Sequence, residues 1–163
     1  HFSPEDIRRV MKPDAVLVLP ESCLAAAQAA GFSPTQLLPV RPGTHETVKG
    51  IPFSAVAAYN VGKPFHPKAN SWVGYAADLD GCRVYVAGDT DDTPEARAVI
   101  CDAAFLPVGG TYTMTAPEAA ALANVLRPQI AVPTHYGSIV GRMSDGDDFA
   151  AALAADIRCV KLI

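Results

Sequence analysis

Two short apolar stretches of the sequence end in side chains that can bind a metal ion. Residues 84–87 read Val-Tyr-Val-Ala and lead through Gly88 to Asp89, and residues 131–134 lead in the same way to His135. Such runs favour buried strands, and ligands usually bind beyond the strand ends of open α/β sheets. Gly88 gives the backbone freedom to turn after its strand. We therefore expect Asp89 and His135 to form two walls of one site.

Histidines elsewhere in the chain extend this candidate set. The chain has four histidines, and three of them, His1, His66 and His135, begin or interrupt predicted loops. Imidazole and carboxylate together suit zinc, manganese or iron. Taken singly, each has another explanation, because a loop histidine is usually a surface or hydrogen-bonding residue and Asp89 could cap a turn. We assign His45, in a polar stretch after a Pro-Gly turn, no metal role.

Composition limits the partners. The chain has 163 residues, half of them hydrophobic and 18% charged, which is typical of a globular protein, and we expect one domain over residues 1–163. A net charge of −4 gives no basic footprint for nucleic acid. No apolar run approaches the roughly 18–20 residues that span a bilayer. We expect a small-molecule substrate, with a phosphorylated one and a homo-oligomer left open, and neither a nucleic-acid nor a membrane partner.

The cysteines and the first residues bear on cellular context. Cys23, Cys82, Cys101 and Cys159 are scattered without a CxxC pair, which predicts reduced, mostly buried thiols in a cytoplasmic protein. The chain starts on a histidine directly before a helix signal, without a methionine. We therefore expect further residues to precede His1.

Local signals predict alternating strands and helices. Ser3 and Pro4 begin a helix to about Met11, and Gly31 ends a second one that starts near Pro20. Asp80-Gly81 is a turn dipeptide of a tight hairpin. The predicted strands are 15–19, 36–40, 51–59, 72–79, 83–87, 103–108, 131–134 and 158–163, and the later helices are 93–100, 115–126 and 147–155. This order predicts a layered α/β domain.

Four ordered blocks, residues 65–68, 84–91, 106–114 and 133–137, resemble the metallo-β-lactamase superfamily. The likeness is greatest to its small bacterial and archaeal metal-dependent hydrolases, the branch that includes the ascorbate-6-phosphate lactonase-like proteins. The resemblance implies an αββα sandwich of two sheets covered by helices. It also implies that the N-terminal strands of that fold are missing from this chain.

The resemblance assigns roles to the candidate ligands. It implies that His66 binds a first metal, that His135 and His1 bind a second, and that Asp89 bridges the two, with Asp89 and His135 as the catalytic pair. The implied cofactor is two divalent ions, zinc first, with manganese or iron as alternatives. The family's His-x-His-x-Asp-His run is represented only by its last histidine, His1. We therefore expect the complete protein to be the enzyme, and the metal site of this chain to be impaired or empty.

The reaction expected of a complete site needs no side-chain nucleophile. Two bound divalent ions lower the pKa of a shared water to near 7, and the resulting hydroxide attacks an ester, lactone or phosphodiester. Gly109, Gly110 and Thr111 could turn N–H groups toward an anion, although a plain strand-to-loop turn is at least as good an explanation. Tyr112, Met114 and Tyr136 are candidates for the substrate wall. Asp91 either orients a metal-bound histidine or is solvated.

Three functions fit these observations. The first is a metal-dependent hydrolase of small molecules. The second is a catalytically degenerate domain of the same fold that binds a ligand or partner. The third is an unrelated α/β binding protein in which the histidines are incidental.

Overall fold

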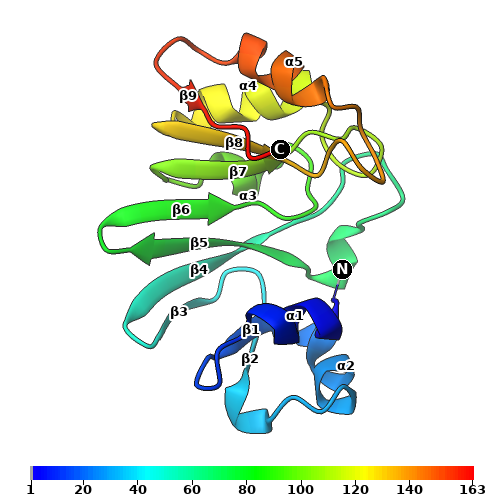
Figure 1. Cartoon of the computed structure of the whole chain (residues 1–163), viewed down its shortest axis with the longest axis vertical. Coiled ribbons are helices and arrows are strands. Elements are labelled where there is room, and N and C mark those ends of the chain that lie inside the picture. The colour runs from blue at the N-terminus through cyan, green and yellow to red at the C-terminus, as the bar shows by residue number, and fades with distance from the viewer. Residues whose placement is uncertain (1) are drawn as a thin grey trace.

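One large sheet organises the computed structural model, which describes residues 2–163 (Figure 1). Its seven strands lie in chain order from β3 to β9. They are β3 (His45–Val48), β4 (Ile51–Ala57), β5 (Val73–Leu79), β6 (Cys82–Val86), β7 (Ala103–Pro107), β8 (Ile130–Thr134) and β9 (Arg158–Cys159). The pairs from β3 to β6 are antiparallel and those from β6 to β9 are parallel. Strands β4, β6, β7 and β8 therefore all end at the same edge of the sheet.

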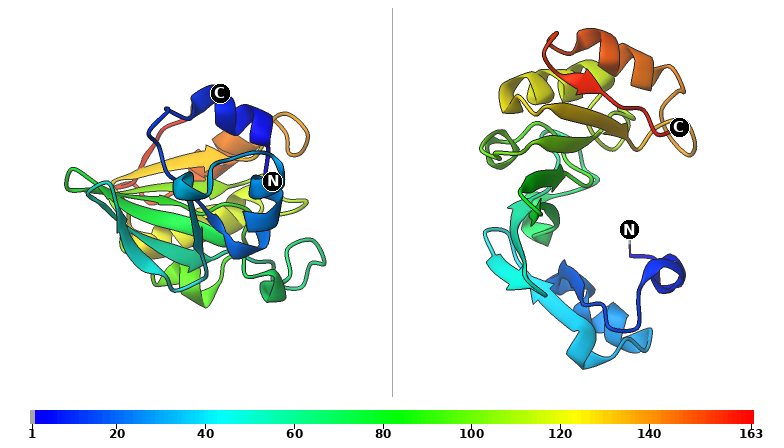
Figure 2. Two further views of the ribbon diagram at one scale, coloured as in Figure 1. Left: turned by 90° about the horizontal axis from the view of Figure 1, so that it is seen from below. Right: turned by 60° about the vertical axis from the view of Figure 1, so that its left-hand side comes forward.

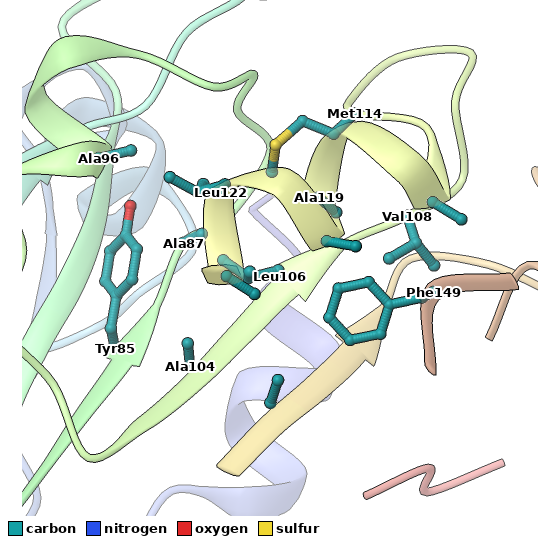
Figure 3. Close-up of a cluster of buried hydrophobic side chains, with 14 of the residues drawn as sticks. Tyr85, Ala87, Ala96, Ala104, Leu106, Val108, Met114, Ala119, Leu122 and Phe149 are labelled. Atoms are coloured by element: carbon teal, nitrogen blue, oxygen red, sulfur yellow. The ribbon is translucent and has the colours of Figure 1, made fainter. Parts of the chain in front are cut away.

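Three helices cover one face of the parallel half of this sheet. They are α3 (Pro94–Arg97), α4 (Ala116–Leu126) and α5 (Asp145–Ala152). Small side chains of α4, such as Ala119, pack with Tyr85, Leu106 and Phe149, all of which are fully buried (Figure 3). Alanines in this position let the helix approach the sheet closely, so that the large side chains fill the remaining space.

The N-terminal segment forms a smaller unit below the antiparallel half of the sheet in Figure 1. It consists of α1 (Pro4–Val10), β1 (Leu17–Pro20), the 3₁₀ turn η1 (Glu21–Cys23), α2 (Leu24–Ala29), the turn η2 (Pro34–Gln36) and β2 (Leu37–Val40). Strands β1 and β2 pair in parallel. Val40 and Leu38 pack on Phe53 and Tyr75 of the large sheet, on the face opposite the helices. The predicted α/β class is thereby confirmed.

Most local signals act as predicted. The Ser3 side chain accepts a hydrogen bond from the Asp6 N–H at the start of α1, and Thr93 accepts one from Ala96 at the start of α3. Asp80 and Gly81 have φ values of 53° and 84°, as the predicted two-residue hairpin requires.

Several element predictions are wrong in extent, and one strand was missed. The helix expected over 93–100 is only Pro94–Arg97, and the strand expected over 51–59 ends at Ala57. The segment 20–30 divides into η1 and α2. The last strand, expected over 158–163, is only Arg158–Cys159, because it pairs with β8 through two residues at the sheet edge. The last helix spans 145–152 instead of 147–155. The missed strand is β3, which a Lys49-Gly50 turn with φ values of 51° and 83° joins to β4.

The cysteine prediction is correct in chemistry and wrong in burial. All four cysteines are free thiols. Only Cys101 is buried, whereas Cys82 is exposed because it opens β6 next to the hairpin turn. Within residues 2–163, none of the helices has the length and apolar character that crossing a bilayer would need.

The buried Phe149 gives the first test of this packing. Phe149 is 0% exposed, and Phe149→Ala should lower the free energy of unfolding by about 3–5 kcal/mol, since it leaves a cavity between α4, α5 and the sheet. The matched control is Phe65→Ala, because Phe65 is 44% exposed and its loss should cost about 1 kcal/mol of stacking energy. Urea denaturation measures both, and equal losses would contradict the assigned core.

Candidate metal centre

Asp89 lies at the sheet edge, three residues after β6 ends at Val86. The backbone of residues 86–87 passes so close to Gly74 of β5 that a Cβ there would lie 2.4 Å from the Ala87 carbonyl oxygen. Gly88 then has φ +67°, a conformation that favours glycine. The two glycines together turn the Asp89 side chain, which is 21% exposed, away from the line of the strand.

His135 is held in a conformation that residues other than glycine rarely adopt. Its φ is +59°, which costs on the order of 1–3 kcal/mol and is typical of functional sites. A Cβ at Gly109 would lie 2.2 Å from the His135 carbonyl oxygen. The absence of a side chain at Gly109 therefore allows the loop after β7 to pass against the loop after β8, which fixes the direction of the imidazole.

His66 has its orientation and tautomer set by hydrogen bonds. Its Nδ1 lies 3.1 Å from the Asn60 side-chain oxygen and 3.2 Å from the Tyr112 carbonyl oxygen. Both partners are acceptors, so Nδ1 carries a proton, and in the neutral ring Nε2 presents a lone pair. Asn60 is fixed in turn, because its side-chain N–H donates to the Tyr112 carbonyl at 2.9 Å and its oxygen accepts from the His66 backbone N–H at 3.0 Å. Metal-binding histidines are commonly oriented in this way.

Asp91 anchors the loop that carries His66. It is 6% exposed and accepts hydrogen bonds from the Val61 N–H at 2.8 Å and the Lys63 ammonium at 2.7 Å. Lys63 also donates to the Thr113 carbonyl at 2.7 Å. The expectation of a solvated Asp91 is therefore wrong, and its side chain bonds to this loop instead of to an imidazole.

A second ion pair fixes the far end of the same loop. Lys68 lies 2.6 Å from a Glu95 carboxylate oxygen, and the Tyr59 hydroxyl donates to the other oxygen at 2.7 Å. Hydrogen bonds from Lys68 and Tyr59 lower the pKa of Glu95 to about 2. Glu95 therefore stays ionised well into the acid range, and the loop remains attached to α3 at neutral pH.

The three loops bring two imidazoles to one carboxylate oxygen. Nε2 of His66 lies 3.4 Å from Oδ2 of Asp89, and Nε2 of His135 lies 3.6 Å from the same oxygen. Two ligand atoms at about 2.0–2.1 Å from a tetrahedral zinc ion are about 3.3–3.4 Å apart. The spacing and the donor types therefore fit ligands that share a divalent cation.

The convergence falls short of a complete ligand set. Among the side chains of residues 2–163, no group of three or more His, Cys, Asp or Glu is arranged as a finished metal site. His1, the fourth predicted ligand, lies outside the described residues. The metal roles of His66, Asp89, His135 and His1 thus stay predictions, although the structure brings the first three together.

Two cavities meet at His66. One, of about 730 Å³, is lined by His66, His135, Phe65, Tyr112, Tyr136, Ser138, Ile139 and Val140. The other, of about 410 Å³, contains Asp89 and Trp72 and extends to the N-terminal unit. Two of the predicted substrate residues, Tyr112 and Tyr136, therefore lie beside the imidazoles.

The remaining predicted substrate residues lie elsewhere. Gly110 lines a different cavity, next to α5, and Thr111 lines none of these cavities. Their N–H groups donate to the carbonyls of Met114 and Gly109 at 2.9 Å each, so the alternative of a plain turn is correct. Met114 is 1% exposed in the core, and its prediction as a substrate wall is wrong. Nδ1 of His45 lies 2.9 Å from the Ser54 hydroxyl, and His45 is not part of the group around Asp89.

From the sequence, Asn60 was not singled out, and Gly109 was considered only for a turn toward an anion, not for its close approach to His135. Asn60 follows the end of β4 just as Asp89 follows β6, so its position was a usable signal. Gly109 gave no such signal, because its φ is not in the glycine-favouring region and only the close approach of His135 requires it.

Comparison with known proteins gives consistent matches. The family model described as the beta-lactamase superfamily domain matches residues 1–135. A UPF0173 metal-dependent hydrolase of Symbiobacterium thermophilum is 34% identical over 94 residues, which are 53% of this chain and 42% of the relative. Another, from Thermoplasma acidophilum, is 30% identical over 121 residues, 72% of this chain and 54% of the relative. The matches thus span about half the length of these relatives.

A solved structure resembles nearly the whole chain. A Parabacteroides distasonis protein assigned as a metal-dependent hydrolase superposes with a TM-score of 0.81 and 32% sequence identity. The match covers 99% of this chain and 70% of that protein.

Asn60 tests how the imidazole of His66 is positioned. Asn60→Ala removes an acceptor of Nδ1 and should weaken zinc binding about 10–100-fold, since outer hydrogen-bond partners orient a ligand and tune its basicity. Isothermal titration with zinc measures the affinity. The control is Asn70→Ala in the turn η3 (Lys68–Asn70), and an equal loss in both variants would contradict a specific role for Asn60.

Gly109 tests the position of His135. Gly109→Ala places a Cβ against the His135 carbonyl, so the loop must move and the zinc affinity should fall about tenfold or more. The free energy of unfolding should also fall, by about 1–3 kcal/mol. Gly43→Ala is the control: a Cβ at Gly43 has no atom within 4 Å, but its φ of +86° disfavours a side chain, so this variant should lose stability without losing zinc affinity. Unchanged zinc affinity in Gly109→Ala would show that the close approach does not position the imidazole.

Proposed function

The chain belongs to the metallo-β-lactamase superfamily, and from this premise we propose that it forms the metal-binding part of a hydrolase acting on small molecules. The α/β fold of that superfamily, expected from the sequence blocks, is likewise confirmed. The observation that carries the proposal is the meeting of two imidazole Nε2 atoms at Oδ2 of Asp89, at 3.4 and 3.6 Å. The names of the relatives as metal-dependent hydrolases support it.

The donor types of these side chains explain why a cation belongs among them. With its Nδ1 held by two acceptors, His66 presents Nε2 toward Oδ2 of Asp89. Imidazole nitrogen and carboxylate oxygen are both ligands of divalent cations, and we propose zinc, as two ions, with manganese or iron as alternatives.

The chain's own residues prepare the site for hydrolysis. When bound, the metal supplies a water that is nucleophilic at neutral pH and a Lewis acid for the oxygen of an ester, lactone or phosphodiester. Asp89 holds negative charge at the centre, and the fixed Nδ1–H of His66 keeps its Nε2 available for coordination. The Trp72 ring lies 5.5 Å from the His66 ring and shields that side of the imidazole from water.

Two further proposals accompany this function. Four free cysteines favour a cytoplasmic location.

The second candidate function is a ligand-binding domain without catalysis, which is favoured by the lack of a complete metal-ligand group within residues 2–163. Metal content separates this candidate from the hydrolase.

Asp89 provides the decisive variant. In the complete protein, Asp89→Ala should lose the bound zinc and reduce hydrolysis of lactone and phosphodiester probes by at least about 100-fold, because it removes the group that both imidazoles share. Elemental analysis gives the metal content. The emission of Trp72, the single tryptophan, reports zinc binding at His66 without reference to activity.

The histidines supply a matched set of controls. His66→Ala and His135→Ala should behave like Asp89→Ala, whereas His45→Ala, which alters an exposed contact with Ser54, should leave zinc content and activity unchanged. Retention of both zinc and hydrolysis by Asp89→Ala would contradict the proposed centre. Zinc binding without hydrolysis of any probe would favour the second candidate.

A further inference from the structure

The cavity beside the two histidines has a wall of unusual composition for an enzyme that would handle phosphate esters. Apart from the imidazoles of His66 and His135, its lining consists of aromatic, aliphatic and hydroxyl side chains. Neither this cavity nor the smaller one that shares His66 has a Lys or Arg among its described lining residues. Apart from the proposed metal centre itself, an anionic group in this cavity would therefore meet no cationic side chain.

The ammonium group of Lys63, on the loop that carries His66, already has hydrogen-bond partners. Lys63 donates to Asp91 and to the Thr113 carbonyl at 2.7 Å each. Its charge is neutralised by the buried Asp91 carboxylate, and moving it into the cavity would leave that carboxylate unpaired. Lys63 therefore anchors the loop and does not serve as an anion-binding group.

Tyr136 also contributes its ring and not its hydroxyl. A Cβ at Gly146 of α5 would lie 2.5 Å from the Tyr136 hydroxyl oxygen, so the hydroxyl faces the helix. That oxygen is buried and has no hydrogen-bond partner within residues 2–163. The tyrosine is 5% exposed, and what it offers the cavity is apolar surface.

Two of the apolar side chains that line this cavity are exposed to solvent. Ile139 is 95% exposed and Phe65 is 44% exposed. Phe65 packs edge-on against Tyr112, with ring centroids 4.7 Å apart, which gives this side of the cavity a firm aromatic surface. Ile139 lies on the loop after His135, lines the same cavity and leaves its side chain exposed, so it is accessible to a group bound there.

We propose that this cavity, bounded by Phe65, Tyr112, Ile139 and Val140, binds an uncharged aromatic or branched aliphatic group of the substrate, with Ile139 determining that preference. The proposal deepens the proposed function and rests on it, because the scissile bond must lie at the imidazoles for the group to reach this wall. The volume of about 730 Å³ falls within the usual range for small-molecule sites. The preference follows from contact area for apolar groups and from the missing countercharge for anions.

Three hydroxamates separate the metal site from the cavity. Acetohydroxamate carries only the metal-binding head, phenylacetohydroxamate adds a neutral ring, and its para-phosphate ester adds a charge to that ring. Titration calorimetry on the zinc-loaded full chain should show the neutral ring binding about tenfold more tightly than acetohydroxamate, the gain expected for burying an apolar group equivalent to roughly two methylenes. The phosphorylated ring should lose this gain.

Ile139→Asp supplies the residue-level test. It should abolish the gain from the ring and leave the affinity for acetohydroxamate and the zinc content unchanged. Ile100→Asp is the matched control, because Ile100 is 81% exposed and lines a different cavity, and it should change none of these affinities.

The outcomes distinguish failure of the cavity proposal from failure of the proposed function. If acetohydroxamate binds but the neutral ring adds nothing, or the phosphorylated ring binds more tightly, the cavity proposal is overturned and the metal centre stands. If Ile139→Asp retains the full gain, Ile139 does not determine the preference. If acetohydroxamate does not bind and zinc is not retained, the metal centre is refuted, and the cavity proposal falls with it.

Discussion

The convergence of two imidazoles on Oδ2 of Asp89 is the interaction on which the proposed metal centre depends. The hydrogen bonds of His66 direct its Nε2 toward that oxygen. Imidazole nitrogen and carboxylate oxygen are both ligands of divalent cations. The superfamily membership and the spacing of the ligand atoms agree with a divalent metal among these side chains.

The fold holds these side chains in place through backbone features that would otherwise be unfavourable. His135 has a positive φ, and the chain passes close to Gly74 and Gly109. The large buried core beneath α4 and the parallel strands, where Tyr85, Leu106 and Phe149 are fully buried, supplies the rigidity that offsets this strain (Figure 3). The positions of the Asp89 and His135 side chains therefore depend on the packing of the core as well as on the loops that carry them.

The surroundings of the centre differ between its two sides. Ion pairs such as Lys63–Asp91 and Lys68–Glu95 lie behind the histidine loop and fix its path. The cavity in front is apolar. Figure 2 shows the N-terminal unit and the helix-covered half of the sheet at opposite ends of the molecule, joined through the antiparallel strands. Charges thus stabilise the loop, whereas the described lining of the cavity contains neither Lys nor Arg.

The sequence by itself determined the elements that nearest neighbours control. Ser3 and Thr93 capped their helices, Asp80-Gly81 formed its hairpin, and the positions of Asp89 and His135 after buried strands were readable because side-chain type and strand periodicity are local properties. Ordered sequence blocks also identified the superfamily. The local turn Lys49-Gly50 was present too, although β3 was not predicted from it.

Only the tertiary structure decided which of these side chains meet. Strand β4 runs in the same direction as β6, β7 and β8 because two antiparallel pairings separate it from β6, and this parity carries Asn60 and His66 to the edge where Asp89 and His135 lie. The roles of Asn60 and Gly109, the burial of Met114 and the pairing of Asp91 with Lys63 depend on contacts between segments far apart in the chain. Contacts of that kind are fixed by strand pairing and packing, which no local window of sequence specifies.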